Sequence, residues 1–314
     1  MTDRVEDIGH DPMFPLFTPA ASAPHIRSSS GQNPEVPDHR WYRKDAESFR
    51  YQAALYSAGQ AFLDLEKSRI MESMITQRDR ATTVLLTDSG GYQIGKGTLS
   101  GGEVFRNDIH GRNADTIRSK ILRWMEEFGD YGMTIDFPTW ALGMPNYLFQ
   151  KTEECLQETL YNLDFITEHR RLGQTKLLNV IQGNDYLQAK RWYDHVKEYP
   201  FEGWSFAGYV SRDPNIMVKI LLSMWRDGNI NAKQRWIHVL GRSSLNAVWN
   251  VNIIHRCIRE HIFRDAQVSY DTASAVKLGI YGKLITGHRV NRDEIVLEVQ
   301  EIDQIGRASC RERV

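Results

Sequence analysis

From residue 82 onward, the sequence alternates short apolar runs with longer amphipathic stretches. Because strands that alternate with helices form parallel sheets, this pattern predicts an α/β protein with a closed (β/α)8 barrel of the TIM type. An open doubly wound sheet is the alternative. The amphipathic stretches predict helices at 115–128, 152–170, 185–198, 214–227 and 244–263. The apolar runs predict buried strands at 82–87, 132–136, 177–182, 204–207, 236–240 and 267–271.

A barrel of eight strands needs two strands more than these six. We expect them either before residue 82 or in the segment 281–298, which favours a hairpin. Residues 45–75 have a helix-forming composition and predict two short helices interrupted near Gly59. Residues 1–45 hold six of the ten prolines and predict an irregular Pro-rich N-terminal arm, so the catalytic barrel domain is predicted at 46–304.

The composition narrows the class of protein. A net charge of −1 excludes a globally basic nucleic-acid binder but leaves room for a local basic groove. No apolar run approaches the roughly 20 residues of a membrane span, and no apolar signal segment is recognised, so no membrane partner is expected. Three cysteines without CxxC spacing favour a reducing, cytoplasmic location. The last ten residues, 305–314, resemble translated sequencing-adapter read-through, which predicts a non-native tail and a truncated native C-terminus.

Polar residues and glycines stand at the ends of the predicted strands. In a barrel these ends meet at one mouth, although they are far apart in the sequence. Carboxylates there suit glycosidic chemistry, in which one attacks the anomeric carbon and another handles the leaving group's proton. An amide, a carboxylate and backbone N–H groups suit the edge of a purine-like base. A single aspartate is more often a helix cap or turn residue, but three at successive strand ends favour a site. The residues concerned are Asp88, Ser89, Gly90, Gly91, Tyr92, Asp136, Gln182, Gly183, Gly208, Gly241 and Asp271.

These residues resemble the guanine transglycosylases, which exchange guanine for a 7-deazaguanine in tRNA or DNA. The resemblance covers roughly residues 82–300, and its most specific part is the TDSGGYQ motif. The matching segments are 87–93 (TDSGGYQ), Asp136, 181–183 (IQG), Gly208, 240–241 (LG) and 270–271 (YD).

The resemblance implies a role for each matched residue. Asp271 would be the nucleophile and Asp88 the general acid/base. Asp136, Gln182 and Gly208 would bind the edge of the base, and Tyr92 would stack on its face. The implied ping-pong reaction passes through a covalent glycosyl-aspartate and needs no redox cofactor, ATP or catalytic metal.

The chain departs from the tRNA branch of this family at two places. The region before residue 80 differs, and Gly208 is followed by Tyr209-Val210-Ser211 instead of a loop that bears glycine and glutamate. The chain resembles more closely the divergent DNA 7-deazaguanine transglycosylases of phages and bacterial gene islands, which insert 7-cyano-7-deazaguanine. This implies DNA as the favoured partner, tRNA as the alternative, a free 7-deazaguanine base, a bacterial or infected-host cytoplasm and a possible homodimer.

Family members also carry a structural zinc, which three cysteines and a histidine bind beyond the nucleophile. This chain has no such cluster there, because only Cys310 follows Asp271 and it belongs to the predicted non-native tail. We therefore predict no metal ligands in this sequence.

Other functions remain as alternatives. GGYQIGKG at 90–97 nearly matches a P-loop, but Gly97 stands where Ser or Thr should bind magnesium, so a nucleotide triphosphatase is disfavoured. A barrel glycoside hydrolase would also use paired carboxylates. A non-catalytic nucleic-acid-binding homologue is the third alternative, and retention of both Asp88 and Asp271 argues against it. Arg170-Arg171 and Lys190-Arg191 could hold phosphate or form solvated helix faces.

Overall fold

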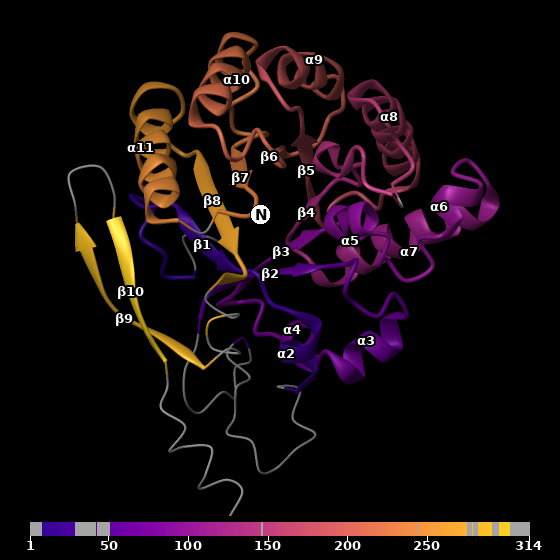
Figure 1. Ribbon diagram of the computed structural model, residues 1–314, viewed down its shortest axis with the longest axis horizontal. Coiled ribbons are helices and arrows are strands. Elements are labelled where there is room, and N and C mark those ends of the chain that lie inside the picture. The colour runs from indigo at the N-terminus through magenta and orange to yellow at the C-terminus, as the bar shows by residue number, and fades with distance from the viewer. Residues whose placement is uncertain are drawn as a thin grey trace, which may run out of the picture.

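The computed structural model describes residues 8–28, 42, 51–145, 147–242, 244–274, 278, 282–290 and 295–301. Eight parallel strands form one sheet in the order β1-β8-β7-β6-β5-β4-β3-β2, and helices surround it (Figure 1). The strands are β1 (Leu16–Pro19), β2 (Ala53–Ser57), β3 (Val84–Asp88), β4 (Tyr131–Met133), β5 (Lys176–Ile181), β6 (Gly203–Phe206), β7 (Trp236–Val239) and β8 (Gln267–Thr272).

The sheet closes on itself between β1 and β2. Ala20 forms a parallel bridge with Leu55, and the N–H of Ala21 donates to the carbonyl of Leu55 at 2.9 Å. On its other side β1 pairs with β8, which places Thr18 opposite Asp271. Each strand therefore neighbours the next one in the chain, and the last strand neighbours the first. The fold is a (β/α)8 barrel of the TIM type, as the sequence predicts, and the open doubly wound sheet is excluded.

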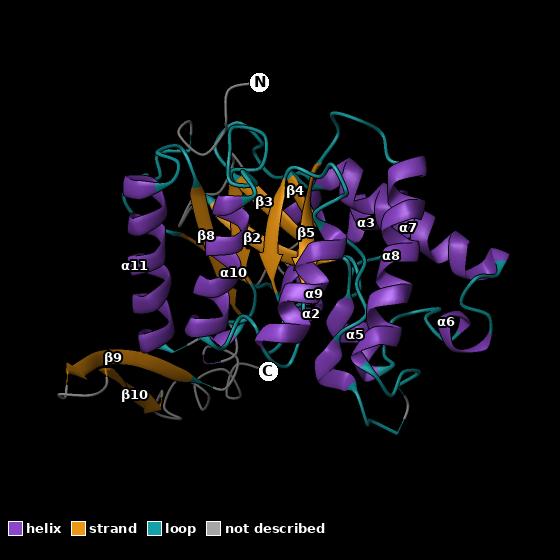
Figure 2. Cartoon of the chain, turned by 90° about the horizontal axis from the view of Figure 1, so that it is seen from above, coloured by secondary structure: helices purple, strands orange, loops and turns teal. Residues whose placement is uncertain are grey.

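A long helix follows each of the strands β3 to β7 and packs on the outside of the barrel (Figure 2). In the first of them, apolar residues at helical spacing are buried, among them Ile121, Trp124 and Met125. The helix after β6 begins at Pro214, and the Asp213 side chain accepts hydrogen bonds from the first turn. The five predicted helices are confirmed: α7 (Arg112–Phe128), α8 (Thr152–His169), α9 (Tyr186–Val196), α10 (Pro214–Arg226) and α11 (Leu245–His261).

The two strands that sequence analysis could not place come from the early region. β1 lies inside the predicted irregular arm, so that prediction is wrong for this segment. β2 lies inside 45–75, where helix was predicted; all five of its residues are buried, and burial on both faces of a parallel strand overrides the helical propensity of its alanines. The other part of the 45–75 prediction holds, since α3 begins there. The remaining short helices are α2 (Ala23–Ser28), α3 (Leu65–Met71), α4 (Ser73–Thr76), α5 (Gly91–Lys96), α6 (Val104–Asn107) and the 3-10 turn η1 (Thr139–Ala141).

The hairpin predicted for 281–298 is confirmed. β9 (Lys283–Val290) and β10 (Ile295–Glu301) pair antiparallel in a sheet of their own. β10 lies next to α11, on the side of the barrel where β8 ends (Figure 1). The predicted tail at 305–314 lies outside the described residues.

The apolar side chains form an inner and an outer layer. The inner layer fills the barrel and includes Leu55, Leu86, Val180 and Trp236. The larger outer layer lies between the strands and the helices. A filled barrel is a packed core with no pore, so a ligand can enter only at its ends. Within the described residues, no helix is long and apolar enough to cross a membrane.

Candidate active site

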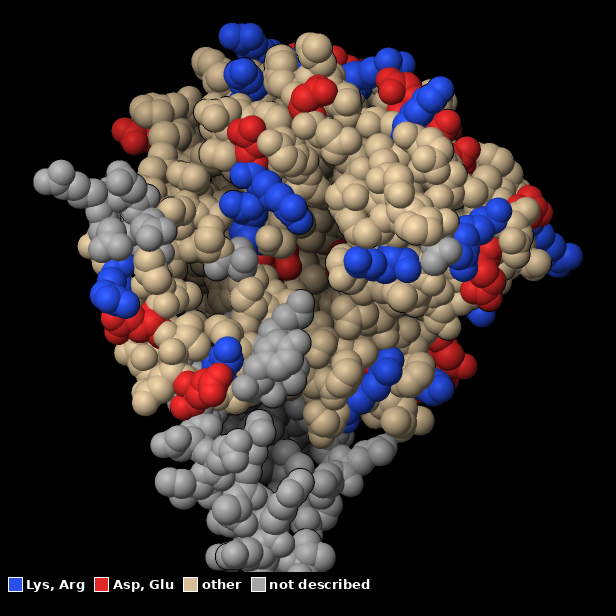
Figure 3. Space-filling view, viewed as in Figure 1, with Lys and Arg blue, Asp and Glu red and all other residues tan. Residues whose placement is uncertain are grey.

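A cavity of about 800 Å³ lies at the carboxyl ends of the strands. Figure 3 shows it as a hollow in the centre of this face, with Lys and Arg side chains at its rim and an acidic group inside. Nine of the eleven predicted site residues line this cavity; the other two, Gly90 and Gly183, do not. The strand-end residues around the cavity are Ala21, Ser57, Asp88, Asp136, Gln182, Gly208, Gly241 and Asp271.

Asp88 ends β3 and is held by two donors. The Ser57 hydroxyl donates to its Oδ1 at 2.6 Å, and the backbone N–H of Gly90 donates to the same oxygen at 2.7 Å. Burial raises the pKa of Asp88 above its ordinary value; the two hydrogen bonds oppose the rise, and the charge of Asp271 adds to it. A carboxyl group with a raised pKa that faces a cavity is suited to exchange protons with a ligand.

Asp136 and Gln182 form a buried pair in the wall of the cavity. The Gln182 Nε2 donates to Asp136 Oδ2, and the Gln182 Oε1 accepts from both the N–H and the hydroxyl of Thr139 at 3.1 Å. Because a backbone N–H can only donate, this contact fixes which end of the amide faces Asp136. Burial raises the pKa of Asp136 to about 7, with opposition from the Gln182 hydrogen bond and a further rise from the charge of Asp88.

Asp271 lies in β8 at the end of a chain of hydrogen bonds through the barrel. The N–H of Gly241 donates to its Oδ1 at 2.7 Å, and His238 Nε2 lies 3.3 Å from the same oxygen. The Trp236 indole donates to Ser269 Oγ at 2.8 Å, and this hydroxyl lies 2.8 Å from His238 Nδ1. Since an ionised carboxylate can only accept, a hydrogen bond from His238 to Asp271 requires the proton on Nε2, and the Ser269 hydroxyl then donates to Nδ1.

Two glycines leave space beside the Asp136–Gln182 pair. A Cβ atom on Gly91 would lie 3.1 Å from Asp136 Oδ1, and one on Gly208 would lie 2.9 Å from Gln182 Oε1. Gly208 also has a φ of +60°, which residues other than glycine rarely adopt. Any larger residue at these positions would cover the polar pair, so both glycines keep it accessible to a flat ligand.

The other predicted residues serve different purposes. Gly90 and Gly183 do not line the cavity: Cβ atoms there would lie 2.7 Å from the Gly59 Cα and 2.6 Å from the Ala189 N, so both glycines permit close packing beneath the site. The Ser89 hydroxyl donates to the Thr134 carbonyl and ties β3 to the chain after β4.

Tyr92 stands at the entrance. It is 62% exposed, and its ring stacks on Trp140 with centroids 5.6 Å apart. Lys96 Nζ lies over the same indole ring at 5.8 Å. Because α5 occupies 91–96 almost directly after β3, this segment has no extended phosphate loop of the P-loop kind.

Several residues that line the cavity, or that contact its lining as His238 contacts Asp271, could not be predicted from the sequence. Ser57 escaped because its strand was predicted to be a helix, and His238 because a histidine inside a strand gives no signal of its own. Trp140 lies in η1 after β4 and Arg212 in the turn after β6, where position relative to the strand is the only available signal.

The described residues do not fit the structural zinc that the resemblance implies. Among them, no group of three or more His, Cys, Asp and Glu side chains could hold a metal ion. Cys155 is buried and lies 3.6 Å from the Tyr147 hydroxyl, while Cys257 is exposed on α11. Both precede Asp271, and Cys310 lies outside the described residues.

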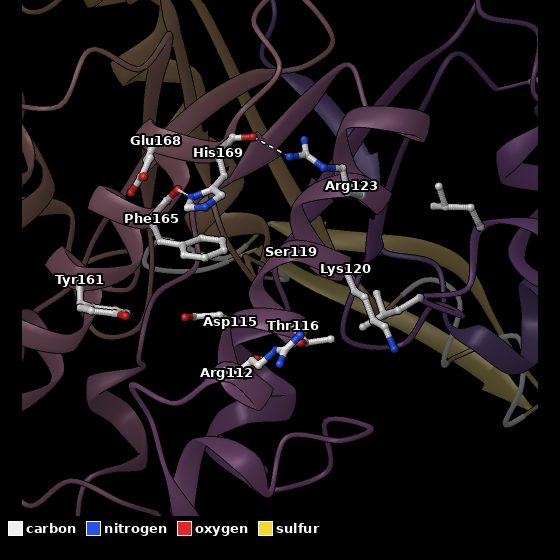
Figure 4. A pocket seen from close by; sticks show the side chains of 12 residues that line it. Arg112, Asp115, Thr116, Ser119, Lys120, Arg123, Tyr161, Phe165, Glu168 and His169 are labelled. Atoms are coloured by element: carbon white, nitrogen blue, oxygen red, sulfur yellow. Dashed lines mark hydrogen bonds between the residues drawn. The ribbon is translucent and has the colours of Figure 1, made fainter.

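A second cavity, of about 590 Å³, lies on the outer surface between α7 and α8 (Figure 4). Two of its charged side chains are engaged with neighbours: Arg123 donates to Glu126 and to the His169 carbonyl, and Asp115 accepts from Arg118. It is remote from the strand ends, where barrel enzymes have their active sites. We therefore assign the candidate site to the strand-end cavity.

Comparison with known proteins adds little to this assignment. No family model matches the chain, and no curated protein matches its sequence. Among solved structures, it is similar to a putative deoxyribose-phosphate aldolase from Toxoplasma gondii ME49 in its apo form, with 9% identity and a TM-score of 0.44 over 85% of this chain and 93% of that one. It is also similar to ornithine decarboxylase from Entamoeba histolytica, with 11% identity and a TM-score of 0.27 over 68% and 72% of the two chains. At these scores, neither similarity bears on the reaction.

Proposed function

We propose that the protein is an enzyme, a base-exchanging transglycosylase that replaces guanine in a nucleic acid with a 7-deazaguanine. DNA is the favoured polymer and 7-cyano-7-deazaguanine the favoured incoming base. This proposal is carried by the presence of two kinds of polar groups in one cavity. Two carboxylates, Asp88 and Asp271, face a common space, and the Asp136–Gln182 pair offers the acceptor and donor groups that a guanine edge requires.

The base would bind between the Asp136–Gln182 pair and the aromatic entrance. Guanine presents an oxygen acceptor beside N–H donors on one edge. The Asp136 carboxylate accepts from the donors, and the Gln182 amide, with its nitrogen end fixed toward Asp136, donates toward the oxygen. Tyr92 covers the face of the base, and the two cavity glycines give it room.

In the first step, an Asp271 carboxylate oxygen attacks C1′ of the target nucleotide. The bond from C1′ to the base nitrogen breaks, and Asp88 gives its proton to the departing guanine. In the second step, Asp88, now ionised, takes the proton from the ring nitrogen of the incoming base. This nitrogen attacks C1′ and releases Asp271, so both carboxyl groups return to their starting states. The His238 and Gly241 donors stabilise Asp271 as the anion it must be to attack.

The first test is transfer of a labelled base into duplex DNA and, in parallel, into bulk tRNA. Asp271→Asn keeps the size of the side chain and removes the nucleophile, so it should abolish transfer. Asp194→Asn, on a half-buried acid of α9 that does not line the cavity, should transfer at the wild-type rate. Omission of the free base should leave a DNA–protein adduct that survives denaturation in the wild type and is absent from D271N.

The outcomes separate the alternative functions. Label in tRNA alone would assign the protein to the tRNA branch. Release of guanine without incorporation of label would indicate a hydrolase with water as the acceptor. Binding of nucleic acid by a folded protein that neither releases nor incorporates a base would contradict an enzymatic function.

A further inference from the structure

Arg212 lines the cavity after β6, and Arg242 directly follows Gly241, which lines it after β7. Arg212 lines the cavity from the turn after β6, where its N–H donates to the Tyr209 carbonyl at 2.9 Å. Arg242 follows β7, and its N–H donates to the Asp271 carbonyl at 2.7 Å. The second arginine is thereby tied by its backbone to the residue that carries the nucleophilic carboxylate.

Neither guanidinium has an ion pair or a side-chain hydrogen bond within the described part of the chain. Two arginines that support the fold are paired instead. Arg78 contacts Asp130 at 2.7 Å, and Arg170 contacts Glu202 at 2.7 Å. The rim arginines therefore differ from the structural arginines of this fold.

The two unpaired cations lie close enough to affect one another. Burial lowers the pKa of Arg242, and the positive charge of Arg212 lowers it further. Two like charges held together without a counter-ion cost free energy in the empty protein, and an anion bound between them would recover it. Figure 3 shows Lys and Arg side chains gathered at this rim.

The surrounding fold also favours an anion at this place. α10 begins two residues after Arg212 and α11 three residues after Arg242. Helix N-termini carry partial positive charge, and barrel enzymes frequently bind phosphate with the loops that follow late strands. By contrast, the ionised Asp271 carboxylate gives the cavity itself a negative field that repels a polyanion.

We propose that Arg212 and Arg242 together bind a backbone phosphate of the nucleic-acid strand, next to the nucleotide whose sugar faces Asp271. This placement of the sugar rests on the proposed function, whereas the phosphate site itself can be measured without any reaction. The planar guanidinium forks match phosphate oxygens, and they offset the repulsion of the carboxylates at the point where the strand enters.

The test is the salt dependence of binding of a short single-stranded DNA oligonucleotide, measured by fluorescence anisotropy from about 50 to 200 mM salt. Arg212→Gln and Arg242→Gln should each weaken binding roughly tenfold and reduce the slope of log Kd against log salt by about 0.7, the value for one lost phosphate contact. Arg242→Lys keeps the charge and should retain most of the slope. Arg226→Gln, on an exposed arginine at the far end of α10, is the matched control and should behave as the wild type.

Guanosine 5′-monophosphate, used as a competitor, identifies the source of the phosphate. If it displaces the oligonucleotide weakly and with the same arginine dependence, the site binds phosphate and the strand supplies it. If it binds as tightly as the oligonucleotide, a free nucleotide is the ligand and the strand proposal is overturned. Wild-type slopes in both glutamine variants would also overturn it, even in a protein that exchanges bases. Reduced slopes in a protein that exchanges no base would support the phosphate site and contradict the transglycosylase.

Discussion

The Ser57 hydroxyl donates a hydrogen bond of 2.6 Å to Asp88, across the adjacent ends of β2 and β3. The register of the two strands sets this contact, because Ser57 lies directly opposite Asp88. A donor aimed at the carboxylate stabilises its ionised form. Ser57 therefore limits how far burial can raise the pKa of the proposed general acid/base.

Ser57→Ala should shift the pH dependence of base exchange. Loss of the hydrogen bond raises the pKa of Asp88 further, so a smaller fraction is ionised at neutral pH and the capture of the incoming base slows. In the pH–rate profile, we expect the limb that reports ionised Asp88 to shift to higher pH by about one unit. The rate at pH 7 should fall roughly tenfold. Ser205→Ala is the control, because this equally buried hydroxyl has no hydrogen-bond partner among the described residues. An unchanged pH profile in S57A would assign Ser57 a purely structural role.

Asp136 should make guanine binding depend on pH. Its pKa is about 7, so below this value the carboxyl becomes protonated and can no longer accept from both donors of the base. Affinity for guanine, measured by calorimetry, should fall as the pH drops below about 7, by up to tenfold per unit. Asp136→Asn should bind weakly at every pH and show no such dependence. Equal pH dependence in the variant would exclude Asp136 as the titrating group.

Asp136 should also make the free energy of unfolding decrease as the pH rises, whereas an aspartate with a lowered pKa makes it increase. The folded pKa of Asp136 is raised from 3.8 to about 7, so between these values the folded protein binds more protons than the unfolded chain. Its contribution to the free energy of unfolding must therefore decline as the pH rises from about 4 to 7. D136N should remove this decline and raise the stability at pH 7 relative to the wild type, as denaturant titrations at several pH values would show. A wild-type pH profile in D136N would contradict this linkage.

His238 should act on the rate of covalent attack through Asp271. His238→Phe removes the Nε2 donor to Asp271 and the Nδ1 acceptor of the Ser269 hydroxyl, so we expect formation of the DNA–protein adduct to slow about ten- to a hundredfold. His238→Gln can place an amide N–H near the same position and should recover part of the rate. Guanine affinity should not change in either variant, because the proposed base site consists of other residues. A parallel loss of guanine affinity would indicate a general disturbance of the cavity.

Glu72 should be essential for stability. It is fully buried and accepts hydrogen bonds from Tyr56 at 2.7 Å, Ser68 at 2.7 Å and Arg27 at 3.2 Å, which joins α2 to the barrel. Glu72→Ala leaves these donors without an acceptor and should cost about 3–5 kcal/mol of unfolding free energy in denaturant titrations. The exposed Glu66→Ala should cost less than about 1 kcal/mol. Similar losses in the two variants would refute the central position of Glu72.

The convergence of Asp88, Asp136, Gln182 and Asp271 was predictable because parallel strands of a barrel end at one mouth. A residue that directly follows a barrel strand in the sequence therefore lies near this mouth, whatever the details of packing. The cavity-lining role of Gly208 followed in the same way. The fold class could be predicted for a related reason, since the helices of the second half carry a strong amphipathic period.

The remaining features depend on tertiary contacts that no local pattern reports. β2 has the sequence AALYS, whose alanines favour helix, and only burial between two neighbouring strands makes it extended. β1 has four residues and ends in proline, which gives too short a signal for a strand. With β2 misassigned, Ser57 could not be placed beside Asp88. The distinction between glycines that border the cavity, such as Gly91, and those that only allow packing, such as Gly183, required the positions of their neighbours.

The pairing of β1 with β8 has a consequence for biosynthesis. The Thr18 hydroxyl donates to the Tyr270 carbonyl across a sequence separation of 252 residues. Nearly the whole described chain must therefore be synthesised and leave the ribosome exit tunnel before this contact forms. Until then the nascent sheet keeps β1 and β7 as open edges, which need protection from association with other chains. β8 fills the gap between them and brings Asp271 with it. The nascent protein thus acquires its proposed nucleophile in the same step that closes the barrel. A ribosome-bound intermediate without β8 should therefore be unable to exchange bases in a nucleic acid.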